Sequence, residues 1–308
     1  MDKATLIADE TGSRLFLKQD VVVLEPPEGR PHRIGLAALK QILIKGDIEF
    51  SSRLLNRCLD AGVSLVLIPG RARDPVHHLL PHASGALPLR LGQYAAFLDP
   101  RRRLELAQTF VTEKIESQTE CLKNRGLNAE LQRFVHSVRQ AADLSSLLGV
   151  EGAATAHYFN LWAPLLDPAW GFKGRNRRPP RDPVNALLSL SYTMACHAVG
   201  RVAGQEGFET TLGFLHCPEP GRPSFALDLM EPLRPWVDEW VLTLCADGGM
   251  TPDDFTTGPV DGCRLSKAAS ARYFQRWFTT AEHWFEHEAR QILSKLSNQL
   301  HLDTRFSG

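Results

Sequence analysis

The sequence contains little that would place it among secreted, disulfide-bonded or membrane-spanning proteins. Its six cysteines are scattered and form no CxxC pair, which argues against a disulfide framework and against a zinc ribbon. No apolar run approaches the length that spans a bilayer, and the opening residues, MDKATLIADETG, lack the apolar core of a signal peptide. We therefore expect a cytoplasmic protein with reduced thiols and no membrane contact.

A net charge is also lacking, and so are several common catalytic motifs. The 35 lysines and arginines balance 35 aspartates and glutamates, so the formal net charge is zero. Any contact with nucleic acid must therefore come from local basic patches. The chain has no GxSxG, no P-loop and no GxGxxG between a strand and a helix, which argues against the hydrolases and nucleotide-binding proteins that those motifs mark.

The pattern of apolar residues predicts an α+β fold with a small N-terminal β-rich domain and a larger all-α C-terminal domain. Short β-prone segments, each bounded by Gly, Asp or Pro, recur at residues 5–8, 15–18 and 21–24. Residues 51–61 have helical spacing, and residues 63–68 form a continuous apolar run that suits a buried strand. We place this β-rich domain at residues 1–90.

The second domain is predicted at residues 101–308, after a hinge at residues 91–100. Apolar residues recur at helical spacing over residues 104–124, and similar patterns continue to the end of the chain. Further helical segments are expected at residues 130–141, 144–148, 151–162, 184–199, 236–245 and 268–300, with a boundary near Gly149 or Gly152. Residues 247–262 are expected to form a loop.

A candidate metal site lies in the segment TLGFLHCPEPGRPSFALDLMEPLR, residues 211–234. His216 closes a short apolar run, and Asp228 and Glu231 stand three residues apart among apolar neighbours. Carboxylates in so apolar a segment would be partly desolvated, which is costly unless a cation compensates. An imidazole and two carboxylates suit a divalent metal. The alternative is a histidine with a structural role and two surface acids.

Glu151 and a basic loop complete the set of candidate residues. Glu151 is a possible further ligand, although it could instead favour the N-terminus of a helix by opposing the helix dipole. The loop GFKGRNRRPPR carries five positive side chains, at Lys173, Arg175, Arg177, Arg178 and Arg181. Such side chains hold phosphates through charge-assisted hydrogen bonds, which predicts contact with a nucleic-acid backbone. The alternative is a run of solvated charges.

Four segments together resemble the CRISPR-associated integrase family one, the spacer-acquisition endonuclease of CRISPR systems. They are EGAATAHYF (151–159), NRRPPRDPVNALLSLSYT (176–193), GFLH (213–216) and GRPSFALDLMEPLRP (221–235). The resemblance covers essentially the whole chain. Taken in this order the motifs are highly specific, whereas any one of them alone would not be.

The resemblance implies a metal site built by Glu151, His216 and Glu231, with Asp228 as an additional ligand or as a group that orients the ligands. The metal would be Mg²⁺ or Mn²⁺. The reaction would be attack by the 3′-hydroxyl of a short duplex on a phosphodiester of the CRISPR repeat, and isolated members also cleave DNA. The expected partners are double-stranded DNA (prespacer and CRISPR repeat), a second copy of the chain joined through the β domain, and the small CRISPR-associated protein two in a heterohexamer.

Two alternatives remain open at this point. The first is a non-catalytic DNA-binding scaffold of the same complex, in which the acids are structural and the arginines bind the DNA. The second is a nuclease for RNA or branched DNA that has no connection with CRISPR arrays. The first alternative predicts nucleic-acid binding with a steep salt dependence and no metal-dependent turnover.

Overall fold

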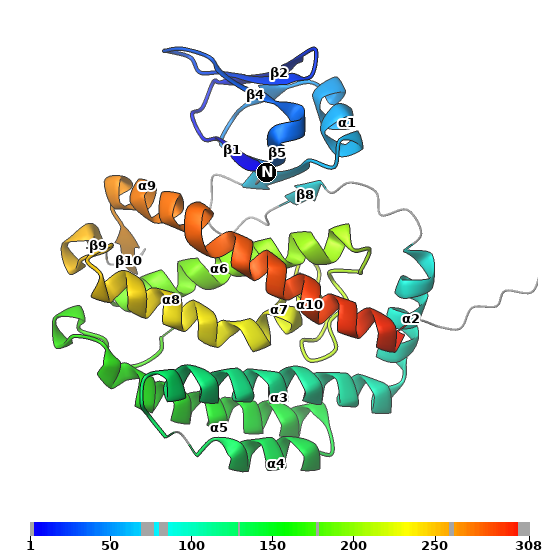
Figure 1. Ribbon diagram of the computed structural model, residues 1–308, viewed down its shortest axis with the longest axis vertical. Helices are drawn as coiled ribbons and strands as arrows, with labels where there is room; N and C mark the ends of the chain where they lie inside the picture. The colour runs from blue at the N-terminus through cyan, green and yellow to red at the C-terminus, as the bar shows by residue number, and fades with distance from the viewer. Residues whose placement is uncertain are drawn as a thin grey trace, which may run out of the picture. The chain divides into compact units, whose positions relative to one another are not determined.

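The protein divides into two compact units, one rich in strands and one helical (Figure 1). The computed structural model describes residues 3–68, 77–79, 86–128, 130–176, 179–258 and 262–300. Residues 1–86 with 204–207 form the first unit, and residues 87–203 with 208–308 form the second. This order confirms the predicted α+β class, with β structure first and helices after it.

Among the described residues of the first unit, the strands form two four-stranded sheets. One consists of β1 (Ala4–Ala8), β5 (Leu39–Lys45), β7 (Ser64–Ile68) and β8 (His77–Leu79), in that order. The other consists of β4 (His32–Gly35), β3 (Val21–Glu25), β2 (Arg14–Lys18) and β6 (Glu49–Phe50). Strands β1, β5 and β7 are parallel, whereas β2, β3 and β4 pair antiparallel. Parallel strands are commonly buried on both faces, which explains the continuous apolar run of β7.

Helix α1 (Ser52–Asp60) closes the core of this first unit. Ser51 caps it by accepting a hydrogen bond from the Leu54 amide. The side chains of Leu54 and Cys58 are fully buried, and because they are four residues apart they share one face of the helix. They join a cluster with apolar residues of both sheets, among them Leu15, Ile42 and Leu65.

Helix α3 (Pro100–Asn124) is central to the contacts within the second unit. Asp99 caps its first turn, and Pro100 takes the first helical position, where a missing N–H costs nothing. It packs against α2 (Leu87–Leu98), α4 (Gln132–Gln140), α5 (Leu144–Trp162), α8 (Arg234–Ala246) and the 3-10 turn η4 (Glu231–Leu233). Figure 1 shows α3 and α5 side by side. The buried face of α3 therefore meets both elements that carry the candidate acids Glu151 and Glu231.

The predicted hinge at residues 91–100 consists mostly of helix, because residues 91–98 belong to α2. Glycine and proline in this stretch suggest a turn. Pro88, just before this stretch, lies in the first turn of α2, where proline is tolerated. A Cβ added at Gly92 would lie 1.8 Å from the carbonyl oxygen of Leu300, so glycine here lets α2 and α10 (Glu282–Leu300) pack closely. The two compact units meet in sequence between residues 86 and 87.

Helix α5 joins two segments, residues 144–148 and 151–162, that the sequence indicated as separate helices. Asp143 caps it in a reciprocal hydrogen-bonding arrangement with Ser146, and the helix continues without a break through Gly149 and Gly152 to Trp162. Glu151 is therefore in the middle of a helix. The alternative that this side chain stabilises a helix N-terminus is wrong.

The remaining helices follow the predicted pattern, with one correction. Helix α6 (Pro183–Gln205) precedes α7 (Ser224–Met230), and α9 (Lys267–Arg276) joins α10 through a π-helical turn at Trp277–Ala281. The expected loop at residues 247–262 instead contributes the strand β9 (Phe255–Gly258), which pairs antiparallel with β10 (Gly262–Leu265). Two short strands of this kind leave too weak an alternating pattern to be detected.

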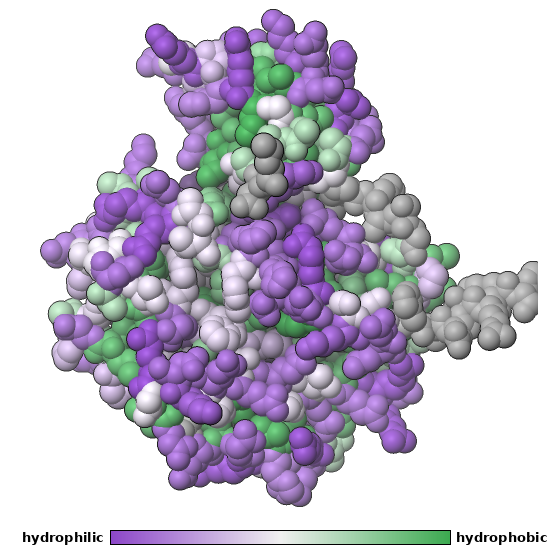
Figure 2. Space-filling view, in the orientation of Figure 1, coloured by the Kyte–Doolittle hydropathy of each residue, from purple (hydrophilic) through white to green (hydrophobic). Residues whose placement is uncertain are grey.

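The visible face of the helical unit is mostly hydrophilic, and its apolar side chains form scattered small patches (Figure 2). Within the described ranges, no helix has the length and apolar character needed to cross a membrane.

Candidate functional site

Asp228 organises the turn that carries His216. Its Oδ2 accepts hydrogen bonds from the amides of Phe214 and Leu215, and its Oδ1 accepts one from the amide of His216 at 2.9 Å. The same Oδ1 lies 2.7 Å from Nδ1 of the His216 imidazole. Because the carboxylate is fully buried and both oxygens are already bonded, Asp228 orients the imidazole and leaves Nε2 as its free nitrogen. Of the two roles that the resemblance implies for Asp228, this geometry favours the orienting one.

Gly213 allows this turn to close. A Cβ at this position would lie 2.7 Å from the backbone carbonyl oxygens of both His216 and Ser224. No side chain fits so close to two backbone atoms, so the apolar run GFLH can fold back on α7 only with glycine at its start. The turn places His216 beside Glu231, with Nε2 at 3.9 Å from the Glu231 Oε1.

Glu231 is buried and receives two positive side chains. Its Oε2 accepts a hydrogen bond from Lys114 Nζ at 2.7 Å, and its Oε1 accepts one from Arg234 Nε at 2.8 Å. Burial by itself would raise the pKa of Glu231, but the charges of Arg234, Lys114 and His216 lower that pKa to about 2. Glu231 is therefore ionised at neutral pH, despite having almost no exposure to water.

Glu151 approaches the same centre from α5. Its Oε1 accepts hydrogen bonds from Lys114 Nζ and from Thr155 Oγ1, the latter at 2.9 Å. The side chain of Glu151 is 20% exposed and that of His216 is 19% exposed, whereas the Lys114 side chain is only 5% exposed. The centre thus has a buried floor, formed by Lys114 and Glu231, and one partly open side.

The structure therefore brings three predicted residues together with Lys114, which the sequence did not single out. Glu151 and Glu231 are joined through the Lys114 ammonium group, and His216 borders Glu231. Across the part of the chain that the structure describes, no three His, Cys, Asp or Glu side chains are already arranged to hold a metal ion. The donor set itself, two carboxylates and one imidazole, still fits Mg²⁺ or Mn²⁺. A cationic group already lies between the two carboxylates, so the position attracts positive charge.

A second buried network adjoins Glu231. The guanidinium carbons of Arg234 and Arg175 lie 5.0 Å and 5.2 Å from the ring centroid of Tyr192. The Tyr192 hydroxyl donates a hydrogen bond to the buried Asp238 carboxylate. Burial raises the pKa of Asp238 to about 6, against the hydrogen bond from Tyr192 and the charge of Arg175, which lower it. This network links the basic loop to the acid site.

The basic loop presents its charges unequally. Lys173 and Arg181 are exposed, whereas the Arg175 guanidinium is half-buried and donates to the Asn185 side chain at 2.8 Å. Asn185 also accepts from the Asn176 amide, which fixes the loop against α6. The predicted contacts at Arg177 and Arg178 lie outside the described residues. Arg175 thus serves as a structural anchor of the loop, and Lys173 and Arg181 remain free to face a ligand.

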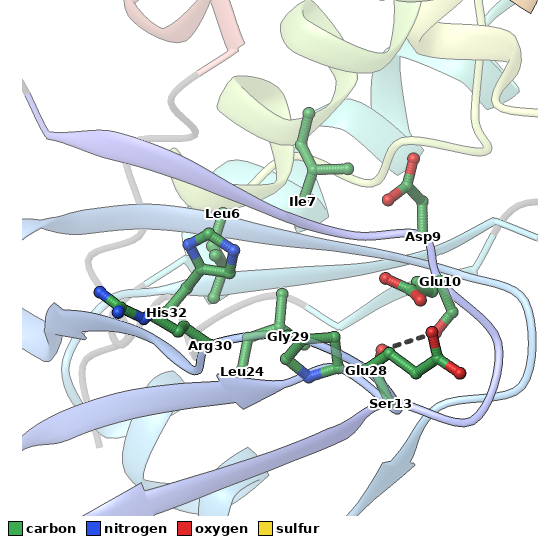
Figure 3. Close-up of a pocket in the computed structure, with 11 residues that line it drawn as sticks. Leu6, Ile7, Asp9, Glu10, Ser13, Leu24, Glu28, Gly29, Arg30 and His32 are labelled. Carbon is green, nitrogen blue, oxygen red and sulfur yellow. Dashed lines mark hydrogen bonds between the residues drawn. The ribbon is translucent and has the colours of Figure 1, made fainter.

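A cavity of about 380 Å³ lies within the first unit and contains none of the predicted site residues. Figure 3 shows Asp9, Glu10 and Glu28 at one end of it and Arg30 and His32 at the other. The cavity is lined by both acidic and basic side chains, and these do not converge on one position. We therefore assign no chemical function to the cavity.

The comparisons with known proteins identify the family of the chain and agree with this fold. The sequence pattern of the family described as CRISPR associated protein Cas1 matches residues 6–279. The chain belongs to this Cas1 family. It is 36% identical over 256 residues to the CRISPR-associated endonuclease Cas1 3 of Thermus thermophilus, a match that spans 79% of this chain and 73% of that protein.

Solved structures share the fold at lower sequence identity. A Cas1 protein from Thermotoga maritima superposes with a TM-score of 0.84 at 22% identity, covering 100% of this chain and 99% of that one. A casposase bound to integration product gives a TM-score of 0.81 at 20% identity, with coverage of 97% and 91%. A Cas6-RT-Cas1–Cas2 complex gives 0.76 at 23% identity, covering 98% of this chain and 35% of that one.

Proposed function

We propose that this protein is a divalent-metal-dependent DNA endonuclease and integrase that inserts short foreign DNA into a CRISPR array. The observation that supports the proposal best is that Lys114 joins Glu151 to Glu231 and that His216 borders Glu231, in a member of the Cas1 family. The 3′-hydroxyl of the incoming DNA attacks a phosphodiester of the repeat. The bond to the leaving oxygen breaks as the new one forms, and no covalent enzyme intermediate is needed.

The metal would be held by Glu151, Glu231 and Nε2 of His216. When bound, Mg²⁺ or Mn²⁺ would polarise the phosphate and stabilise negative charge on the attacking and leaving oxygens. Asp228 keeps the His216 imidazole in position, because its carboxylate binds both Nδ1 and the backbone amide of that residue. Arg234 holds the Glu231 carboxylate from one side, so that its orientation is fixed before substrate arrives.

The DNA would approach the site from its partly open side, and the exposed charges of the basic loop would bind the DNA backbone. Lys173 and Arg181 suit this role because they are exposed, and Arg175 fixes the loop that carries them. Arg177 and Arg178 remain predicted DNA contacts. The proposal extends to double-stranded DNA, to a homodimer formed through the first unit, and to CRISPR-associated protein two in a heterohexamer. The solved complex of Cas1 and Cas2 supports the last of these partners.

One observation favours the alternative of a non-catalytic DNA-binding scaffold. The Lys114 ammonium satisfies both carboxylates without any metal, so the acids could act as purely structural partners of Lys114. The scaffold would bind DNA with a steep salt dependence and would show no metal-dependent strand transfer.

The two functions are separated by a strand-transfer assay with supercoiled array plasmid, short duplex DNA, CRISPR-associated protein two and Mn²⁺. Glu151→Gln and His216→Ala should each lower strand transfer and DNA cleavage by at least about 100-fold, since even residues that only support metal ligands contribute 10–100-fold. Glu120→Gln, which changes an exposed acid on α3, should leave both activities unchanged. Full activity of the Glu151 and His216 variants would refute the site. An inactive wild type that still binds DNA would support the scaffold.

A further inference from the structure

Lys114 lies between the two acids of the candidate metal site, and the proposed reaction gives it no role. We infer that Lys114 is the internal counter-ion of this site: its ammonium group takes the place of the divalent ion between Glu151 and Glu231, and metal binding displaces it. The inference rests on the proposed function and adds a positioning residue that competes with the metal.

The placement of Lys114 supports this role. Its Nζ contacts Oε1 of Glu151 and lies 2.7 Å from Oε2 of Glu231, so a single point charge bridges acids that come from two different elements. Arg234 cannot do the same, because it bonds the other oxygen of Glu231 and is not in contact with Glu151 in the described structure. A divalent ion bound to both carboxylates would need the space that Nζ occupies.

The electrostatics point in the same direction. Two carboxylates brought together with little access to water repel each other, and removing the cation between them leaves uncompensated buried charge. Lys114 removes this repulsion before any metal arrives and keeps the acids at the spacing of a bridging cation. A lysine suits the task because its charge is compact and its four-carbon stem is flexible, so the ammonium group can move aside without disturbing α3.

Two substitutions at Lys114 are expected to change the affinity for Mn²⁺ in opposite directions. Lys114→Met keeps the length of the side chain and removes its charge. In EDTA it should lower the melting temperature by about 5–10 °C, as expected for loss of a buried charge partner. It should also bind Mn²⁺ about tenfold more tightly than the wild type, because no ammonium group has to be displaced. Lys114→Arg keeps the charge and adds a second donor toward the carboxylates, so it should bind Mn²⁺ about tenfold more weakly.

The experiment measures thermal unfolding in EDTA and Mn²⁺ affinity by calorimetric titration, on the full chain. Lys123→Met is the matched control, since it removes a lysine from the exposed surface of the same helix and should match the wild type in both measurements. Equal Mn²⁺ affinity of the wild type and the Lys114 variants would overturn the inference while leaving the metal site intact. Absence of Mn²⁺ binding in every variant would overturn the proposed function as well. If Lys114→Met does not fold, the Mn²⁺ affinity of Lys114→Arg alone tests the inference.

Discussion

Asp228 shows how one side chain can determine the shape of a site without touching a substrate. Its two oxygens accept from three successive amides and bind the imidazole of His216. Asp228→Asn replaces one acceptor oxygen by an NH₂ group that would face these donors. We expect a loss of about 2–4 kcal/mol in the free energy of unfolding, because buried donors are left unsatisfied, and a 10–100-fold loss of strand transfer. Chemical denaturation and the plasmid assay measure the two effects.

The matched control for this variant is Asp253→Asn, which changes an exposed aspartate in a 3-10 turn. It should change stability by less than about 0.5 kcal/mol. If Asp228→Asn were as stable and as active as this control, the hydrogen bonds of Asp228 would not position His216.

Some side chains of the candidate site could be identified from the sequence, and others could not. His216, Asp228 and Glu231 were predictable because polar groups in an apolar segment need a reason to be there. Lys114 was missed, because lysine in a long helix ordinarily faces water. A signal existed nevertheless: Lys114 lies at helical spacing from the buried residues Ala107, Val111 and Gln118.

At the scale of elements, the turn between Thr211 and α7 is constrained by close backbone contacts at Gly213. Gly213→Ala would place a methyl group 2.7 Å from two backbone oxygens, so the turn must open and carry His216 away from Glu231. We expect a loss of about 1–3 kcal/mol in stability, as for other overpacked sites. Metal-dependent strand transfer should fall together with stability.

Gly149→Ala provides the matched control for Gly213→Ala. Gly149 lies inside α5 with nothing within 4 Å of an added Cβ, so alanine should stabilise the protein by about 0.5–1 kcal/mol. Both variants are compared by thermal unfolding. A Gly213 variant that behaved like the Gly149 variant would show that the GFLH turn tolerates a side chain and does not depend on close backbone contact.

The positions of helices and strands along the chain were easier to predict than the pairing of the strands into sheets. The strands at residues 15–18 and 21–24 and the helix at 51–61 were expected close to where the structure has them. Their assembly into two sheets was not, because alternation along a strand defines its faces but not its neighbours. In α5, two glycines suggested a helix boundary that does not exist, since the Asp143 cap and the packing on α3 outweigh the cost of glycine.

Across the whole molecule the formal net charge is zero, yet two buried carboxylates, Glu231 and Asp238, have pKa values shifted in opposite directions. Glu231 has a pKa lowered from 4.5 to about 2, so it contributes stability that is present above pH 4.5 and is lost as pH falls toward 2. Asp238 has a pKa raised from 3.8 to about 6, so between these values the folded protein holds a proton that the unfolded chain has released. The contribution of Asp238 to stability therefore decreases as pH rises through that window.

Asp238→Asn isolates this second effect. Asparagine still offers an oxygen to the Tyr192 hydroxyl but does not titrate, so the wild type should lose stability relative to the variant as pH rises from 4 to 7. A change of two pKa units corresponds to about 3 kcal/mol. Urea unfolding at intervals across this range measures the difference, with Asp253→Asn expected to follow the wild type. A difference that stays constant with pH would show that Asp238 keeps its ordinary pKa, and that Arg175 and Arg234 flank an ionised carboxylate throughout.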